Sequence, residues 1–329
     1  MSKRIFRFRK GEPLLDIVSY GRGGPRETGG RLTPAQVEEI RRTVQRLPEA
    51  VVKVLPRDSN DLKAVGKHLD YIGRYGKLEL ETDDSERLQG RIGRAIVEDW
   101  DLDIDDVRRQ GDLAATRGRK PPKLVHKLMF SMPPGTPADK VMAAVRNFAR
   151  EQFALQHRYA FALHTEEAHP HVHVVLKAVS EQGVRLNIKK ATLRYWRSEF
   201  ARNLRLLGVP ANATERAVRG ESQKAKKDGV YRATLRGDSS YMRAQAEAVA
   251  ADLIKGHILT GPVKRSLVQT RREVEQGWRA VGNILLSEGE KSLAMLVSRF
   301  VDEMLPARTE KEQLAEKLLE QAHEARGRD

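Results

Sequence analysis

The sequence of 329 residues contains no cysteine, which excludes disulfides, zinc ribbons, iron–sulfur clusters and thiol nucleophiles together. It also lacks an apolar run long enough to span a bilayer. The first ten residues interleave basic side chains with Ile5, Phe6 and Phe8, unlike the continuous apolar core of a signal peptide. We therefore expect a soluble, cytoplasmic protein without membrane insertion, whose chemistry uses side chains other than thiols.

Negative charge is scarce relative to positive charge. The chain has 60 Lys and Arg against 45 Asp and Glu, which gives a formal charge of +15 and a pI near 10.0. This excess predicts a polyanionic partner, and nucleic acid is favoured over a membrane surface. Residues 183–240 alone carry +9, whereas residues 79–106 carry −8 and are interpreted as a solvated acidic face.

The spacing of apolar and chain-breaking residues predicts an α+β domain over residues 50–230. A basic flexible arm and a short helix precede it at 1–49, and a helical C-terminal domain follows at 231–329. Trp196 and Phe200, four residues apart on one predicted helix, are expected to face the core. Along the chain we predict helices at 34–47, 58–76, 137–153 and 189–208, and strands at 50–56, 77–81, 121–133, 158–164 and 171–179.

Four of the nine histidines cluster in the segment ALHTEEAHPHVHVVLKAV. Side chains alternate along a strand, so His171 and His173 point to one face. The polar segment 165–170 is short enough for a hairpin connection, which would bring His164 towards that pair. Three imidazoles could then hold one divalent metal ion and leave positions open for a substrate.

The neighbours of these histidines have other roles in this interpretation. His169 lies on the turn and is expected to be structural. Glu166 is predicted to support the site by accepting the second N–H of a ligand histidine. The same HPHVHVV pattern also fits a histidine-triad nucleotide hydrolase, which needs no metal. Such an enzyme would not account for the basic segment 183–240.

A tyrosine lies on the predicted 58–76 helix. Leu62, Val65, Leu69 and Ile72 form one apolar stripe, and Tyr71 lies about 180° away from Leu62, on the opposite face. A phenol that points away from the core, in a basic protein with a metal site, is a candidate nucleophile for a phosphodiester. Tyr75 is a second candidate, beyond the expected helix end.

Four segments, in this order, resemble the motifs of conjugative relaxases of the mobilisation-nuclease family, in the subgroup typified by the T-DNA border endonuclease. They are HLDYIGRYGKLELE, HKLMFSMPPGT, LHTEEAHPHVHVVLKA and ATERAVRG. The resemblance covers residues 50–222. It implies the fold of HUH endonucleases, a mostly antiparallel sheet flanked by helices.

The resemblance also implies the chemistry. Tyr71 would attack the scissile phosphate of single-stranded DNA at a transfer origin and form a covalent 5′-phosphotyrosyl adduct. Glu166 would support the reaction, His126 falls in the middle motif, and the metal ligands would be His164, His171 and His173. Magnesium or manganese is expected in use, although imidazoles favour zinc, nickel or cobalt.

The expected DNA contacts are the basic residues near Tyr71 and after the histidine strand: Arg74, Lys77, Lys177, Arg185, Lys189, Lys190, Arg194 and Arg197. By resemblance, an accessory DNA-binding protein and a type IV secretion coupling protein would be partners, and the protein would be translocated to a recipient cell while attached to DNA. Two alternatives stay open: a rolling-circle replication or transposition nuclease with the same chemistry, and an accessory DNA-binding protein with a structural metal site.

Overall fold

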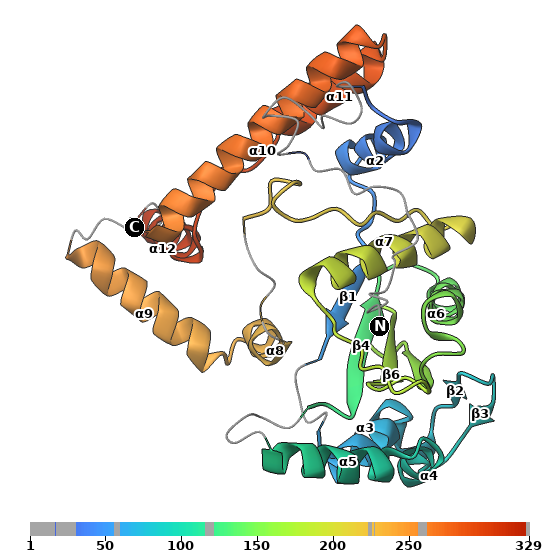
Figure 1. The fold of residues 1–329 in the computed structure, drawn as a ribbon. Helices are drawn as coiled ribbons and strands as arrows, with labels where there is room; N and C mark the ends of the chain where they lie inside the picture. The colour runs from blue at the N-terminus through green and yellow to red at the C-terminus, as the bar shows by residue number, and fades with distance from the viewer. Residues whose placement is uncertain are drawn as a thin grey trace. The chain divides into compact units, whose positions relative to one another are not determined.

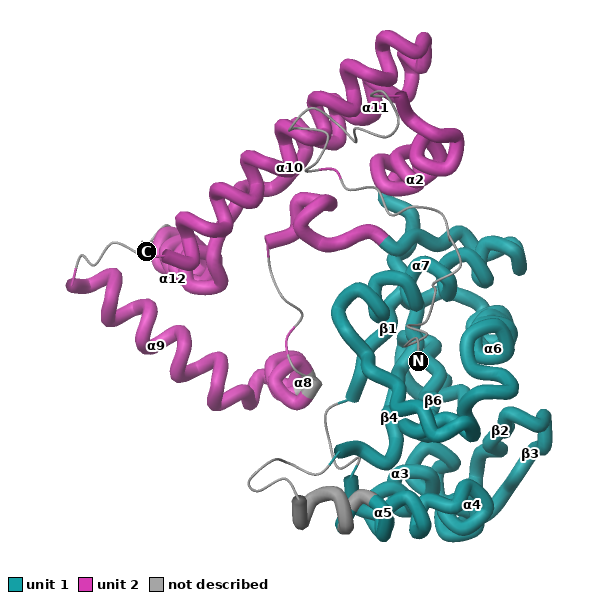
Figure 2. The backbone as a smooth tube through the Cα atoms, in the orientation of Figure 1, with its two compact units in different colours: residues 1–13, 46–213 teal, residues 14–45, 214–329 magenta. Residues whose placement is uncertain are grey.

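The computed structural model describes residues 17, 31–55, 60–115, 122–222, 226, 228–255 and 262–326. Its described residues form two compact units, one within 46–213 and the other within 14–45 and 214–329 (Figure 2). The predicted arm lies outside the described residues except for Ile17, and the division into domains at 50 and 230 stays a prediction. Among the described helices, none combines the length and apolar character needed to cross a membrane.

A six-stranded antiparallel sheet organises the first unit (Figure 1). The strand order is β1-β4-β6-β5-β2-β3. The strands are β1 (Val51–Val54), β2 (Leu80–Thr82), β3 (Arg87–Leu88), β4 (Val125–Ser131), β5 (Tyr159–His164) and β6 (His171–Lys177). The long strands β4, β5 and β6 lie at the centre, so both of their faces need a helical cover.

Two layers of helices supply that cover (Figure 1). One core cluster joins β6 to helices α6 (Ala138–Phe153) and α7 (Lys190–Leu206). The residues that β6 contributes to it are Val172, Val174 and Leu176. Val175 belongs to the cluster formed with the opposite layer of helices. The helices of this unit are α3 (Leu62–Ile72), α4 (Gly93–Asp99), α5 (Leu102–Ala115), α6 (Ala138–Phe153) and α7 (Lys190–Leu206), with a short 3₁₀ turn, η2 (Arg74–Gly76), after α3.

The second unit is helical in its described residues. Its core includes Ile40 of α2 (Pro34–Val44), Trp278 of α10 (Pro262–Ser287) and Phe300 of α11 (Lys291–Asp302). The rings of Trp278 and Phe300 lie 5.2 Å apart between centroids, and the Trp278 indole donates a hydrogen bond to the Val218 carbonyl at 2.8 Å. Its helices are α2 (Pro34–Val44), α8 (Asp228–Arg236), α9 (Ser240–Ile254), α10 (Pro262–Ser287), α11 (Lys291–Asp302) and α12 (Glu310–Arg326).

The α+β class, with a mostly antiparallel sheet, flanking helices and a helical C-terminal region, is confirmed. Trp196 and Phe200 are buried in the core, as expected. Most acidic residues of the segment 79–106 are exposed, as predicted, and the segment contains β2, β3, α4 and the start of α5. Its carboxylates include Asp83 and Asp99, which form ion pairs with Arg158 rather than facing only water.

Candidate active site

The β5–β6 hairpin brings three histidines together at one end of the sheet. His164 and His171 are direct partners in the ladder, and His173 lies opposite Ala162. The three ring centroids are 4.7–5.2 Å apart. One ligand atom from each ring lies within 4.8 Å of the other two. The predicted convergence of the three imidazoles is therefore present in the structure.

Backbone carbonyls fix the orientation of two of these rings. His164 Nε2 donates to the Ile72 carbonyl at 2.7 Å, which leaves Nδ1 buried without a hydrogen-bond partner. His171 Nδ1 donates to the His169 carbonyl at 3.0 Å, so its Nε2 carries the free lone pair. Metal-binding histidines commonly use their second N–H in this way.

Burial keeps the imidazoles in the form that binds metals. It lowers the pKa of His173 to about 3, and it also lowers the pKa of His164. Neutral imidazole has the lone pair that coordination requires. His173 Nδ1, like His164 Nδ1, is buried without a hydrogen-bond partner. Three converging imidazole nitrogens, two of them buried without a partner, fit a divalent transition-metal ion.

Helix α3 places Tyr71 beside this cluster. Asp61 caps the helix at its start by accepting from the Ala64 N–H at 2.8 Å. Val65 and Leu69 of the apolar stripe are fully buried, whereas the Tyr71 side chain on the other face is 43% exposed. The Tyr71 ring lies edge-on to His173, with centroids 6.4 Å apart. An exposed phenol thus lies next to the three imidazoles.

A close helix crossing holds α3 in place. A Cβ on Gly93 of α4 would lie 2.0 Å from the Gly66 carbonyl oxygen, so the two backbones touch and no side chain fits between them. Asp70 accepts a hydrogen bond from the Gly93 N–H at 2.9 Å. The residue just before Tyr71 is therefore anchored to the N-terminus of α4.

The sequence analysis missed His68, which stacks on the Tyr71 ring at 6.0 Å between centroids. Burial lowers the pKa of His68 to about 4, so it is neutral near pH 7. Its position three residues before Tyr71 is the signal that could have found it, because residues three apart on a helix are neighbours.

Glu166 lies elsewhere than predicted. It does not take the second N–H of His164 or His171, since backbone carbonyls already accept those protons. Instead its carboxylate accepts two hydrogen bonds from Arg74, from Nε to Oε1 at 3.0 Å and from Nη2 to Oε2 at 2.8 Å. These hydrogen bonds lower the pKa of Glu166 to about 2. The Arg74 guanidinium carbon also lies 5.3 Å from the centre of the Tyr71 ring.

Tyr75, the second candidate nucleophile, has a different neighbour. It lies on η2 with a left-handed φ of 54° and is 59% exposed. The guanidinium carbon of Arg91 lies 5.9 Å from the centre of its ring. Of the two phenol rings, the one that lies edge-on to His173 is that of Tyr71.

Lys177 and His126 lie away from the histidine cluster. The Lys177 ammonium is buried, 3.5 Å from Glu181 and 3.9 Å from Asp105, so a contact with DNA would require it to leave two carboxylates. His126 lies opposite Leu176, on the other face of the sheet, and its Nε2 contacts the Leu186 carbonyl at 3.2 Å.

The other predicted DNA contacts are more accessible. Arg74 and Arg197 are partly exposed, and the remaining five side chains are exposed: Lys77, Arg185, Lys189, Lys190 and Arg194. Arg185 additionally donates to the Lys123 carbonyl at 2.6 Å. The exposed residues meet the first requirement for contacts with a phosphate backbone.

Comparison with known proteins finds similarity over part of the chain. Residues 85–205 match the family model described as relaxase, MobA/VirD2-like, nuclease domain. The T-DNA border endonuclease VirD2 of Rhizobium radiobacter is 25% identical over 199 residues, which are 54% of this chain and 44% of that protein. VirD2 of Agrobacterium fabrum is 24% identical over 217 residues, which are 59% of this chain and 46% of that protein. No solved structure gives a significant match.

These matches agree with the resemblance indicated by the motifs: residues 85–205 are similar to relaxase nuclease domains of the MobA/VirD2-like type. The family model describes a relaxase nuclease domain, and both relatives are endonucleases of T-DNA borders. The segment that matches the family model contains the three histidines but begins after Tyr71. The matched region spans less than half the length of these VirD2 relatives.

Proposed function

We propose that this protein is a site- and strand-specific DNA relaxase, which nicks one strand at a transfer origin for conjugative transfer or mobilisation of a plasmid or integrative element. The observation that carries the proposal is the exposed phenol of Tyr71 beside three converging imidazoles. The basic surface of the chain supplies the electrostatic attraction that single-stranded DNA requires.

In the proposed reaction, the Tyr71 phenolic oxygen attacks the scissile phosphorus. A bond forms between that oxygen and phosphorus, and the bond from phosphorus to the 3′ oxygen breaks. The phenol gives up its proton and the departing 3′ oxygen gains one, which leaves a free 3′ hydroxyl. The 5′ phosphate stays esterified to Tyr71. One phosphodiester replaces another, so neither ATP nor water is consumed and the strand can later be rejoined.

The three histidines would hold a divalent metal ion, and we propose that nicking depends on it. When bound, the ion would supply a Lewis acid that offsets charge on a non-bridging phosphate oxygen. Magnesium or manganese would serve in the cell, while zinc, nickel or cobalt would bind imidazole more tightly. The backbone bonds of His164 and His171 would keep their free nitrogens aimed at the ion.

We base the proposed wider role on the similarity to the VirD2 relatives named above. Single-stranded DNA at a transfer origin is the proposed substrate, with an accessory DNA-binding protein and a type IV secretion coupling protein as partners. We propose that the protein acts in the cytoplasm and is then translocated to a recipient cell while covalently attached to the nicked strand. The helical region from residue 231 is left without an assigned role.

The deciding experiment is denaturing gel electrophoresis of the full chain with single-stranded oligonucleotides tiled across its presumed transfer origin, in manganese or magnesium. We expect a protein–DNA adduct that survives detergent with wild type and with Tyr75→Phe. The adduct should be absent with Tyr71→Phe, which removes only the hydroxyl. Binding without an adduct in either metal would instead identify an accessory DNA-binding protein.

A further inference from the structure

Two contacts just after Tyr71 tie the end of α3 to the β5–β6 hairpin. One residue after Tyr71, the Ile72 carbonyl accepts the His164 imidazole N–H at 2.7 Å. Three residues after Tyr71, Arg74 forms its two hydrogen bonds with Glu166. Glu166 lies on the turn that connects the strands of the three histidines. The nucleophile and the metal-binding cluster are therefore joined by two contacts that cross 92 residues of sequence.

The contact between Arg74 and Glu166 has a geometry that fixes orientation. Nε and Nη2 meet the two carboxylate oxygens separately, which is the bidentate arrangement that only a guanidinium can make. The same guanidinium lies over the Tyr71 ring at 5.3 Å and interacts with its phenol. Arg74 thus connects the carboxylate to the nucleophile.

The backbone at this point is unusual. Arg74 and Tyr75 both have left-handed φ values, of 49° and 54°, although neither is glycine. Gly76 follows with a φ of 98°, and a Cβ there would lie 2.9 Å from the Gly90 Cα. Non-glycine residues hold this conformation only where surrounding contacts impose it. The turn returns the chain so that Arg74 can reach back over Tyr71.

Glu166 is fully engaged in this contact. Both of its oxygens accept from Arg74, and among the described residues the cluster able to hold a metal ion consists of His164, His171 and His173 without a carboxylate. To ligate the ion or accept the Tyr71 proton, Glu166 would have to give up its hydrogen bonds to Arg74. The structure gives it a contact with Arg74 instead.

We propose that Arg74 is a positioning residue for the Tyr71 phenol, and that Glu166 acts on the nicking reaction through Arg74 rather than as a metal ligand or a proton acceptor. This inference rests on the proposed nicking function. Arg74 holds the ring against the histidine cluster and keeps a positive charge beside the attacking oxygen. Glu166 holds Arg74.

A double-mutant cycle tests this order of action. The variants are Arg74→Ala, Glu166→Gln and their combination, with Arg74→Lys as the variant that keeps charge without the two-pronged contact. The surface pair Arg94 and Glu98, with Nε–Oε1 at 2.8 Å, offers a matched control in Arg94→Ala and Glu98→Gln. The single-turnover rate of adduct formation is measured at saturating oligonucleotide, beside the oligonucleotide Kd and the manganese affinity.

We expect Arg74→Ala to slow adduct formation about 100-fold, because misplacing a reacting group costs this much, while Kd rises by less than about threefold. Glu166→Gln alone should slow the reaction about tenfold with unchanged manganese affinity. The combined variant should be no slower than Arg74→Ala, and Arg74→Lys should recover only part of the rate. The Arg94 and Glu98 variants should react like wild type.

Three results would overturn the inference. The first is that Glu166→Gln slows adduct formation by the same factor with and without Arg74. The second is that Glu166→Gln weakens manganese binding. The third is that Arg74→Ala raises the Kd for the oligonucleotide with an unchanged rate of adduct formation. A second readout needs no nicking: 3-fluorotyrosine at position 71, observed by fluorine NMR. The fluorine signal of Glu166→Gln should differ from that of wild type. The signal of the combined variant should equal that of Arg74→Ala alone. A wild-type chain that forms no adduct would refute the proposed function, while the fluorine signal would still decide the positioning role.

Discussion

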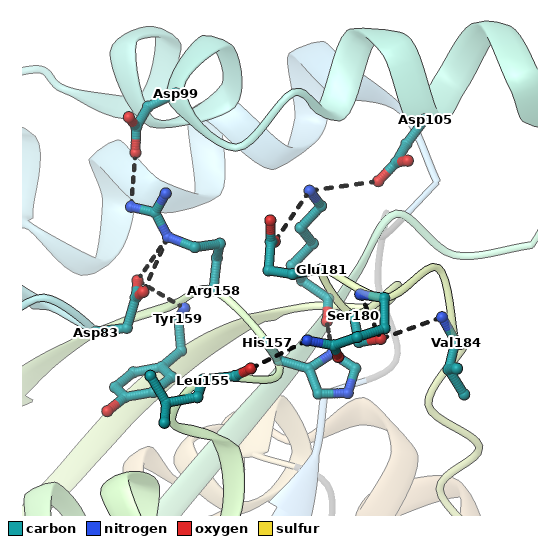
Figure 3. Close-up of polar contacts among 12 residues, drawn as sticks. Asp83, Asp99, Asp105, Leu155, His157, Arg158, Tyr159, Ser180, Glu181 and Val184 are labelled. Carbon is teal, nitrogen blue, oxygen red and sulfur yellow. Dashed lines mark hydrogen bonds and ion pairs between the residues drawn. The ribbon is translucent and has the colours of Figure 1, made fainter.

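Both ends of the β5–β6 hairpin carry charged or titratable groups, but these groups have different partners at the two ends. At the open end, Arg158 just before β5 bonds Asp83 at 3.0 Å and Asp99 at 2.8 Å (Figure 3). Lys177, at the end of β6, lies near Glu181 and Asp105. At the turn end, three imidazoles face each other, and two of their buried nitrogens have no hydrogen-bond partner.

This difference separates a structural polar cluster from a candidate reaction site. At the open end, cations on the hairpin meet carboxylates from the segment 79–106 and from Glu181, so the charges offset one another within the chain. At the turn end, Arg74 and Glu166 form an ion pair, but the three imidazoles converge without a carboxylate among them, which is costly unless a further group binds there. The convergence of three imidazoles, rather than the amount of charge, distinguishes the turn end from the open end.

The largest effect is expected from His173→Ala at the turn end. Loss of one of three ligands should abolish tight manganese binding and lower the rate of adduct formation about 1,000-fold or more, because a Lewis acid contributes several kcal/mol. The fold should persist, since the removed imidazole leaves no partner unpaired at its Nδ1. Isothermal titration with manganese and single-turnover kinetics measure the two losses. Retained metal affinity in this variant would contradict the assignment of the cluster.

Burial also lowers the pKa of a histidine outside the cluster. His126 lies on the other face of the sheet, and burial lowers its pKa to about 4 from about 6.5 in the unfolded chain. Between these values the unfolded state binds more protons, so stability should fall as the pH falls through this window. The loss should reach at most about 3 kcal/mol at pH 4.

Urea unfolding of the full chain between about pH 7 and pH 4 measures this effect. His126→Gln keeps a donor for the Leu186 carbonyl and should show a smaller fall in the free energy of unfolding over the same range. Manganese should not alter the difference between wild type and this variant, because His126 lies outside the cluster. Equal pH dependence in both proteins would mean that His126 is not neutralised by burial.

At the open end, Arg158→Ala should cost stability without changing the chemistry. It leaves Asp83 and Asp99 without their shared cation, and we expect the free energy of unfolding to fall by about 2 kcal/mol. Nicking by the folded variant should proceed at the wild-type rate. Arg236→Ala, which removes a partner of Asp238 in an exposed pair, should cost less than about 0.5 kcal/mol. A large loss of nicking rate in folded Arg158→Ala would show that the two ends are not separable.

The sequence predicts the turn end better than the open end, for a physical reason. Alternation along β6, the short connection 165–170 and the stripe on α3 are local patterns, and they correctly bring His164, His171 and His173 together and expose Tyr71. Contacts between distant segments leave no such pattern. Arg74 and Glu166 are 92 residues apart, and Arg158 is 75 residues from Asp83.

Two segments illustrate the same limit. Most acidic residues of the segment 79–106 are exposed, as predicted, but the sequence does not indicate that Asp99 and Asp105 lie beside Arg158 and Lys177. Lys177 looks like a DNA contact because of its charge. The alternation of side chains along β6 instead indicates burial. It puts Lys177 on the same face as His171 and His173, towards the covering helices.

The smallest expected effect compares two lysines that charge alone does not distinguish. Lys189 is exposed, whereas Lys177 is buried against carboxylates. Lys189→Gln should weaken oligonucleotide binding about threefold and reduce the slope of log affinity against log salt by about 0.7, the value for one phosphate contact on a single strand. Lys177→Gln should leave that slope unchanged and lower the free energy of unfolding instead, because Asp105 loses its cation. Fluorescence anisotropy at several salt concentrations measures the slopes, and a lower slope for Lys177→Gln would show that its ammonium leaves the carboxylates to meet DNA.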